Sequence, residues 1–301
     1  MNGFKIHLLR QIFKRGQVDR MFVSRFAPSP TGLLHLGHAY SALLTQNLVS
    51  KNSGLFQLRI EDIDTTRCKP DFENQIYADL EWLGIRWEHT PLRQSERLSV
   101  YRYNLEKLAD KGLLYGCDCT RADIKKALSA HVDLRNSSNS AIYHGKCRER
   151  NLPLSGNNIR LNLVKSKHYL NKDSLEFLEK GSGPNGETGT QTFSVTWLQE
   201  NYGDFVLARR DIKTSYHLSV IVDDASQKVT HISRGNDLFY VTPIHILLQS
   251  LLKLRIPTYV HHDLVKDNRG NKLAKSKGAE SLLNLRKSGK NPKEIRKMLG
   301  L

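Results

Sequence analysis

The chain has 301 residues, of which 39% are hydrophobic and 25% are charged, a composition typical of a globular protein that buries a core. No run approaches the roughly 18 consecutive apolar residues of a membrane helix, so we expect no membrane partner. The 46 Lys and Arg residues outnumber the 30 Asp and Glu residues and give a net charge of +16, which favours a nucleic-acid partner, although a solvated basic surface is the simpler alternative.

Residues 1–21 stand apart from the rest of the chain. Their basic side chains are opposed by a single acidic one, Asp19, and they lack the apolar centre of a signal peptide. We interpret them as an N-terminal extension, or as a start placed ahead of the true initiator Met21.

From Phe22 onward the pattern predicts alternating strands and helices. A strand at 22–27 leads into a Pro-rich turn at 28–32, and the segment 55–62 alternates between apolar and polar side chains. Between them, apolar residues at helical spacing predict a helix that ends near Gly54. These residues are Leu36, Tyr40, Leu43, Leu44 and Leu48. Strand, helix and strand in this order predict a βαβ unit and a parallel sheet.

Further helices are expected at 71–83 and 95–111. Residues 115–203 are polar, and we expect them to be largely irregular, with the Gly-rich stretch 181–189 as a loop. Strand and helix signals return at 229–235 and at Thr242, which we expect to cap a helix with Pro243 at its first position.

The expected fold class is therefore α/β, with a sheet domain that an inserted segment divides. The expected parts are the extension 1–21, the first half 22–114, the inserted segment 115–203, the second half 204–278 and a short basic helical end 279–301.

The string RFAPSPTGLLHLGH, from Arg25 to His38, carries the first chemical signal. A turn of small residues and prolines feeds a helix whose N–H groups and dipole favour a phosphate. His35 and His38 can donate to phosphate oxygens, and Gly37 permits a close approach to the backbone. The string resembles the HIGH signature of class I aminoacyl-tRNA synthetases, in the form of the glutamyl branch.

Two further strings resemble the glutamate pocket of that family. In RIEDID, Glu61 follows a strand at the sheet edge where open α/β sheets bind ligands, and it shares the polar face of that strand with Arg59. The string from Ser215 to Leu238 contains Tyr216 and Arg234. An arginine suits a carboxylate because its planar fork can bond both oxygens.

The segment GNKLAKSKG, from Gly270 to Gly278, resembles the KMSKS loop of the family. The resemblance implies that Lys272 and Lys275 stabilise the triphosphate as pyrophosphate leaves. Ala274 stands where the family usually has Ser, which removes one hydroxyl and puts full adenylation activity in doubt.

Three of the four cysteines are clustered, at Cys117, Cys119 and Cys147. Without a secretory signal, such a cluster indicates a metal in a reducing compartment, and we expect a cytoplasmic protein with one structural zinc. Asp118, His131, Tyr143 and His144 are candidates for the fourth ligand, and chemistry alone favours a histidine because phenolate is an uncommon zinc ligand. The CxC…YxxxC pattern of the glutamyl-Q branch of the family implies Tyr143, whereas three buried free thiols remain the alternative.

The resemblance covers the chain from about Phe22 to its C-terminus and implies a Rossmann-like catalytic domain with Mg-ATP as substrate. It implies catalytic roles for His35, His38, Lys272 and Lys275. It implies glutamate contacts from Arg25, Ala27, Ser29, Glu61, Tyr216 and Arg234. It implies ATP contacts from Pro28, His35, Gly37, His38 and Lys275.

About 23 residues follow Gly278, too few for an anticodon-binding domain. We therefore expect the activity of the glutamyl-Q branch, in which glutamyl-adenylate is formed and the glutamyl group passes to queuosine in the anticodon of tRNA(Asp). Val220, where glutamyl-tRNA synthetases usually have Asn, favours the same branch. The alternatives are a minimal synthetase that charges a tRNA 3′ end and a catalytically dead, zinc-containing RNA-binding paralogue. We expect a monomer.

Overall fold

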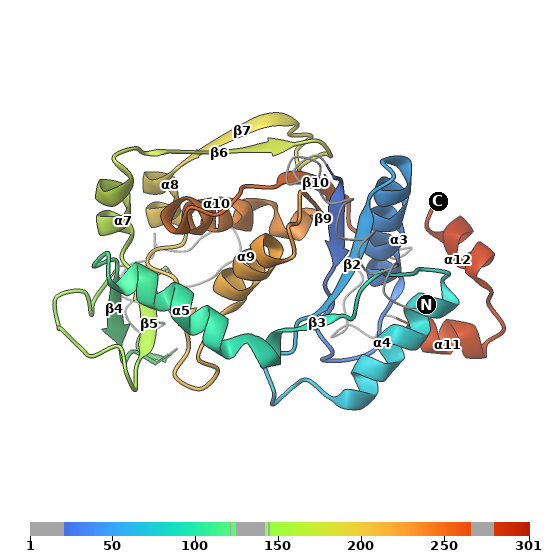
Figure 1. Cartoon of the computed structure of the whole chain (residues 1–301), viewed down its shortest axis with the longest axis horizontal. Helices are drawn as coiled ribbons and strands as arrows, with labels where there is room; N and C mark the ends of the chain where they lie inside the picture. Colours follow the sequence, from blue (N-terminus) through green and yellow to red (C-terminus); the bar gives the residue numbers. More distant parts are fainter. Residues whose placement is uncertain (1–20, 121, 125–141, 144, 266–279) are drawn as a thin grey trace, which may run out of the picture.

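The computed structural model describes residues 21–120, 122–124, 142–143, 145–265 and 280–301. Lys272, Lys275, His131, His144 and residues 1–20, on which predictions were made, lie outside the described residues. Figure 1 shows two adjoining bodies of helices and strands, which meet near β2 of one body and β9 of the other.

The first half contains the predicted βαβ unit. Strand β1 (Val23–Phe26) pairs in parallel with β2 (Leu55–Ile60), and the helix α3 (Leu36–Lys51) connects them. A short third strand, β3 (Leu92–Arg93), extends this parallel sheet beyond β2. The helix α4 (Pro70–Trp82) begins at a proline, whose fixed φ suits a first helical turn.

The buried face of α3 differs from the predicted one. Of the apolar residues at helical spacing, Leu43 is buried, whereas Leu36, Tyr40, Leu44 and Leu48 are only partly covered. The small residues Ala39 and Ala42 are buried instead, together with Thr45 and Val49. Small side chains on the inner face permit the close packing of α3 on β1.

The second half contributes two further parallel strands, β9 (His231–Gly235) and β10 (Thr258–His262). Two helices, α9 (Tyr216–Ser226) and α10 (Thr242–Leu252), pack against each other beside them. Strand β9 lies beside β1. The residue before β9 is bonded to the first residue of β1, since the Val23 N–H donates to Thr230 Oγ1 at 2.8 Å and the Thr230 N–H donates to the Val23 carbonyl at 2.9 Å. The chain thus returns to the first sheet after some 200 residues.

The prediction that Thr242 caps α10 is wrong. Thr242 is the first helical residue, a 3₁₀ turn (Asn236–Val241) leads directly into the helix, and Val241 occupies the cap position without a side-chain hydrogen bond. The Thr242 hydroxyl is occupied elsewhere, since it accepts from Arg234 at 2.6 Å and lies 3.3 Å from the Leu238 carbonyl. The predicted helix at 95–111 likewise begins with a 3₁₀ turn (Gln94–Arg97), followed by α5 (Leu98–Ala109).

The prediction of an irregular stretch is wrong for the described residues 151–203, which form strands and helices. Strand β6 (Ser174–Glu179) pairs with β7 (Gly189–Ser194) and also with β10, so both extend the sheet of the second half in the order β7-β6-β10-β9. The polar composition of this segment led to the wrong prediction because β6 alternates strictly, with Leu175 and Phe177 buried and every second side chain exposed. The Gly-rich stretch 181–189 is the predicted loop, between β6 and β7.

A small antiparallel sheet has the strand order β4-β5-β8, and α5 contacts β4 while α9 contacts β8. Its strands are β4 (Leu114–Cys117), β5 (Asn158–Leu161) and β8 (Val206–Ala208). The helices α7 (Leu163–Leu170) and α8 (Val195–Asn201) pack against each other.

Two hydrophobic cores correspond to the two bodies of Figure 1. One lies around β1, β2, α3 and α4, and it also takes in Leu282 and Leu285 of α11 (Leu282–Lys287) and Ile295 of α12 (Pro292–Met298). The basic helix predicted near Asn291 is confirmed, with Asn291 as its cap. The other core runs from Tyr101 to Tyr259. Among the described helices, none has the length and hydrophobicity that a bilayer crossing requires.

Asp204 joins the small sheet to its surroundings. Its buried carboxylate accepts from the Tyr115 hydroxyl at 2.7 Å, from Arg148 Nε at 2.5 Å and from the Leu163 N–H at 3.0 Å. Just before it, Gly203 has a φ of +60°, and a Cβ there would lie 2.1 Å from the Tyr143 carbonyl oxygen, so only glycine fits.

We expect Asp204→Ala to lower the free energy of unfolding by about 3–5 kcal/mol, because it leaves the Arg148 charge and two further buried donors unpaired. Urea unfolding followed by circular dichroism measures the change. Asp211→Ala is the matched control, since the Asp211 side chain is 68% exposed. A loss below about 1 kcal/mol for Asp204→Ala would show that water replaces these bonds.

Candidate active site

A cavity of about 410 Å³ lies between the two bodies, where β1, β2 and β9 end. Seven residues predicted for the site line it. They are Arg25, Ala27, Ser29, His38, Glu61, Tyr216 and Arg234. The sequence prediction thus selected side chains from four separate segments that the fold brings to one hollow, although Pro28, His35 and Gly37 do not line it.

The two histidines of the first string cap α3 jointly. His35 Nδ1 accepts from the Gly37 N–H at 3.1 Å, and His38 Nδ1 accepts from the His35 N–H at 3.2 Å. Because each ring accepts at Nδ1, each neutral ring carries its proton at Nε2, which leaves Nε2–H as the donor for a phosphate. A Cβ at Gly37 would lie 3.0 Å from His35 Cε1, so a side chain there would displace the capping ring.

Asp224 binds two arginines, of which Arg25 lines the cavity. Its Oδ1 accepts from Arg25 Nε at 2.9 Å and from Arg59 at 2.7 Å. Burial alone would raise the pKa of Asp224, but the two guanidinium charges lower it overall. Arg59 also donates to Glu61 at 3.2 Å. Burial raises the pKa of Glu61, and the charges of Arg59 and Arg25 oppose that rise.

Arg234 is held by neutral acceptors. Its Nε donates to His261 Nε2 at 3.1 Å, one terminal nitrogen lies 3.1 Å from His245 Nδ1, and the other donates to Thr242 Oγ1. Glu179 in turn accepts from His261 Nδ1, which fixes the tautomer that presents a lone pair to Arg234. Within the described part of the chain, no carboxylate forms an ion pair with Arg234, so its charge is not neutralised directly.

The histidines behind Arg234 are kept neutral. Burial, together with the Arg234 charge, lowers the pKa of His245 well below its usual range and that of His217 to about 4. His217 Nδ1 lies 3.4 Å from His245 Nε2 and continues the chain of rings. A second cavity of about 200 Å³ adjoins the first, and both are lined by Ser29, Glu61 and Tyr216.

The predicted lysine loop lies outside the described residues, but its two flanks approach the site. On one flank, His262 Nε2 lies 2.8 Å from Ser41 Oγ, which lines the cavity. On the other flank, Ser281 forms a β-bridge with His35, and the Leu282 N–H donates to the Leu34 carbonyl.

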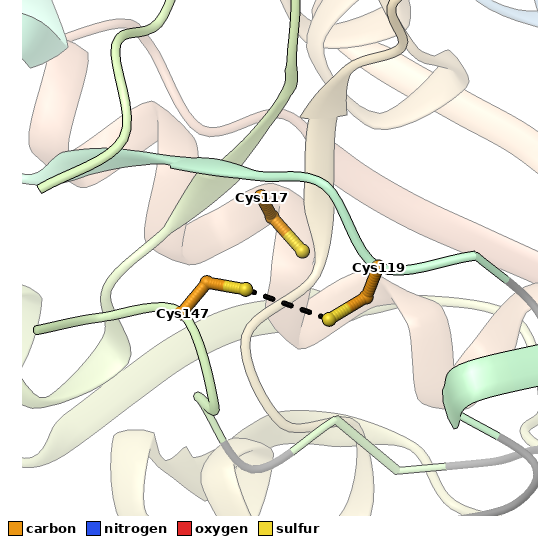
Figure 2. Close-up of side chains that lie close together, drawn as sticks. All are labelled: Cys117, Cys119 and Cys147. Atoms are coloured by element: carbon orange, nitrogen blue, oxygen red, sulfur yellow. Dashed lines mark hydrogen bonds between the residues drawn. The ribbon is translucent and has the colours of Figure 1, made fainter. Parts of the chain in front are cut away.

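Figure 2 shows that the thiols of Cys117, Cys119 and Cys147 converge. Their sulfur atoms lie within 4.8 Å of one another, and those of Cys119 and Cys147 are 3.4 Å apart. Sulfur atoms in a tetrahedral zinc site with Zn–S bonds near 2.3 Å are about 3.8 Å apart. The cluster therefore fits a metal ion of this size, whereas Cys68 lies elsewhere.

The Tyr143 hydroxyl lies close to two of these sulfur atoms. Its hydroxyl oxygen lies 3.5 Å from Cys117 Sγ and 3.9 Å from Cys119 Sγ, and it accepts from the Cys147 N–H. The alternative ligand Asp118 lies 3.6 Å from Cys147 Sγ, but both of its oxygens are bound by Arg150.

Sequence reasoning missed the partners of the predicted residues. Asp224, His245 and His261 were not selected, and Arg59 was assigned to a polar strand face although it is fully buried. One signal was present: Asp223 and Asp224 follow an apolar helical run, and carboxylates in such a position need buried cations.

Comparisons with known proteins agree with this geometry. Residues 21–301 match the catalytic domain of class I tRNA synthetases (E and Q). The chain is 44% identical over 280 residues to the glutamyl-Q tRNA(Asp) synthetase of Rhodobacter capsulatus, which covers 93% of this chain and 100% of that protein. It is 37% identical to the enzyme of the same name from Symbiobacterium thermophilum, covering 91% of this chain and 84% of that protein.

The glutamate–tRNA ligase of Nitratidesulfovibrio vulgaris is 34% identical over 91% of this chain, and the chain spans 55% of that ligase. The crystal structure of glutamate-tRNA synthetase from Elizabethkingia anophelis superposes with a TM-score of 0.69 at 26% identity, covering 86% of this chain and 53% of that one. The chain therefore belongs to the class I (E and Q) tRNA synthetase family and has its Rossmann-like α/β catalytic fold. It is a ligase, and it resembles the glutamyl-Q tRNA(Asp) synthetases.

We expect the buried histidines to make stability depend on acidity. Between about pH 6.5 and pH 4, His217 takes up a proton in the unfolded chain but not in the folded one, so stability falls as the pH falls. The His217→Gln variant should lose less stability across this window, by up to about 1.4 kcal/mol per pH unit. Denaturant unfolding at a series of pH values measures the slope.

The exposed His89 supplies the matched control, and its His89→Gln variant should keep the wild-type slope. Parallel curves for the wild type and His217→Gln would contradict the assignment of a neutral His217 in the folded chain.

Proposed function

We propose that this ligase activates L-glutamate with ATP and transfers the glutamyl group to queuosine in the anticodon of tRNA(Asp). In the first step, an oxygen of the glutamate α-carboxylate attacks the α-phosphorus, the bond to the β-phosphate oxygen breaks, and pyrophosphate leaves. In the second step, a hydroxyl of the queuosine ring attacks the acyl carbon, and AMP leaves.

The observation that carries this proposal is that charged side chains lining the cavity match the charged groups of glutamate. Glu61 offers a carboxylate for the ammonium group, and Arg25 and Arg234 offer guanidinium groups for the two carboxylates. Arg234 is buried, and among the described residues no carboxylate forms an ion pair with it. Buried charges are strongly unfavourable without a partner, so a ligand carboxylate beside Arg234 is favoured over a carboxamide, which favours glutamate over glutamine.

The individual roles follow from the positions of the groups. Glu61 accepts the substrate ammonium, and Arg25 and Arg234 attract its carboxylates, with Tyr216, Ala27 and Ser29 completing the wall. Arg25 has the larger number of N–H groups to offer, because four of the five on Arg234 already have acceptors.

The phosphates are assigned to the start of α3. The rings of His35 and His38 lie there with the positive end of the helix dipole, beside Gly37, and we assign Pro28 to the same ATP site. We also assign Lys272 and Lys275, from the segment between His262 and Ser281, to the stabilisation of the triphosphate, and Mg²⁺ accompanies ATP.

Queuosine as acceptor is supported by the full-length similarity to proteins named glutamyl-Q tRNA(Asp) synthetase. The similarity to proteins named glutamate–tRNA ligase supports the second candidate, transfer to a tRNA 3′ end. The adjoining 200 Å³ cavity, which shares Ser29, Glu61 and Tyr216 with the first, is the space we assign to the acceptor nucleoside.

We further propose that Cys117, Cys119, Cys147 and Tyr143 hold one structural zinc ion in the segment 115–203. Burial raises the pKa of the Tyr143 phenol, so its coordination as phenolate would require the charge of the metal. The ion would tie the end of β4 to the turn before Arg148, which itself bonds Asp204.

The test is glutamate-dependent exchange of pyrophosphate into ATP without tRNA, followed by transfer of labelled glutamate. We expect exchange without tRNA, and transfer only to tRNA(Asp) that contains queuosine. Glu61→Gln should reduce glutamate-dependent exchange by about 100-fold or more, because it removes the carboxylate that pairs with the substrate ammonium. Glu200→Gln, on the exposed side of α8, is the matched control.

Label on the 3′ end of tRNA(Glu), with exchange that requires that tRNA, would establish the second candidate instead. No exchange with glutamate under any condition would indicate a catalytically dead RNA-binding paralogue, and Ala274→Ser would then test whether the missing hydroxyl is the reason.

Elemental analysis of the purified protein should find one zinc per chain. Cys119→Ser should release it, and Tyr143→Phe should weaken its retention against a chelator by about 10-fold or more, since one ligand is lost. Cys68→Ser is the control that keeps the metal. Full zinc content in Tyr143→Phe would exclude Tyr143 as the fourth ligand.

A further inference from the structure

A third cavity, of about 400 Å³, lies outside the site described above, between α5 and the small sheet β4-β5-β8. Its floor is apolar and includes Leu105, Leu114 and Ile159. Hollows of this size are typical of binding sites for small molecules or single groups, and an empty apolar floor is unfavourable in water.

The rim of this cavity is strongly basic. Arg102, Arg209, Arg210 and Lys213 line it, with Glu106 as the single acidic residue. In the part of the chain that the structure describes, Arg102 and Arg210 form no ion pair, although both are exposed. An apolar floor with unneutralised cations above it is complementary to a ligand that has a flat apolar part and an anionic part.

The turn that carries Arg209, Arg210 and Lys213 is fixed by hydrogen bonds of its backbone. The turn is closed by a hydrogen bond from the Lys213 N–H to the Arg209 carbonyl at 2.8 Å, with Lys213 at a φ of +66°. The Arg210 N–H donates to Asn158 Oδ1 at 3.1 Å, which fixes this turn to β5. The backbone that carries these cations is therefore in place before any ligand arrives, which reduces the entropy cost of binding.

The cavity also continues toward the active site. Arg209 lines both this cavity and the 200 Å³ cavity, and that second cavity shares Glu61 and Tyr216 with the 410 Å³ cavity. A chain molecule whose reacting unit lies in the active site can thus reach the apolar hollow with a neighbouring unit.

We propose that this hollow binds one unpaired nucleotide of the acceptor RNA, with its base on Leu105, Leu114 and Ile159 and its phosphate on Arg102 and Arg210. The proposal rests on the proposed function, because it takes an RNA as the partner. A base offers the flat apolar part and its phosphate the anion, so the ligand matches both halves of the cavity.

The experiment measures binding of queuosine-containing tRNA(Asp) to the full chain at several salt concentrations, beside exchange without tRNA. Arg102→Ala and Arg210→Ala should each weaken tRNA binding about 5- to 10-fold and reduce the salt slope by about 1. Ala109→Phe, which fills the hollow from α5, should weaken binding about as much with an unchanged salt slope. All three should keep wild-type exchange.

Lys107→Ala is the matched control. Lys107 lies on the same helix, 4.3 Å from the centre of the Tyr103 ring, and does not line the cavity. An equal loss in Lys107→Ala, or binding within about twofold of wild type in the arginine variants, would overturn the proposal by showing only a general surface charge effect. Unchanged binding in a folded Ala109→Phe would overturn the base site and leave a phosphate contact.

Loss of pyrophosphate exchange in the arginine variants would also overturn the proposal, since it would show that these arginines maintain the structure of the catalytic site rather than bind RNA. If the wild type shows no exchange at all, the proposed function fails, but the binding comparison still decides the cavity because it does not depend on catalysis. Should Ala109→Phe fail to fold, the contrast of Arg102→Ala with Lys107→Ala remains decisive.

Discussion

The buried carboxylate of Asp224 is the interaction on which the two halves of this protein depend. It binds Arg25 of β1 and Arg59 of β2, which lie 199 and 165 residues away in the sequence, and so ties α9 of one core to two strands of the other. Removing one member of such a buried group leaves an unpaired charge and costs about 3–5 kcal/mol. Arg25 also lines the cavity of the candidate active site, so a change at Arg25 that alters substrate binding also acts on the junction between the cores.

This arrangement explains why the cavity lies where it does. Parallel strands place their carboxyl ends along one edge, and ligands of open α/β sheets bind outside that edge. Here Ala27 and Glu61 directly follow the last residues of β1 and β2, and β9 contributes Arg234 near its own end. Because the walls come from both cores, a ligand that bridges them adds to their cohesion, and glutamate is expected to stabilise the fold by mass action as well as to react.

How well the sequence predicts each element of the fold and site depends on whether the residues that bury that element are near it in the sequence. The βαβ unit and the strings around His38 and Glu61 were identifiable, because their periodicity and residue types are local. The burial of Arg59 could not be predicted in this way. Its strand alternates as if one face were exposed, but α9, which is distant in the sequence, packs on that face and binds Arg59 through Asp224. The strand 174–179 was missed for a related reason: its exposed face makes the composition polar, while Leu175 and Phe177 alone mark the buried one.

The contrast between the arginines of the cavity suggests how the protein distinguishes its substrate. Arg25 is neutralised by the carboxylate of Asp224. Arg234 is instead positioned by uncharged groups, the neutral rings of His261 and His245 and the hydroxyl of Thr242. A protonated His261 would present an N–H to the guanidinium, so burial, by lowering the pKa of that histidine, preserves the arrangement. The cost of a buried, unneutralised cation is then offset only when an anion enters. A carboxylate side chain supplies that anion and a carboxamide does not. We therefore expect the neutrality of the supporting histidines to favour glutamate over glutamine, rather than the number of hydrogen bonds that Arg234 can still donate.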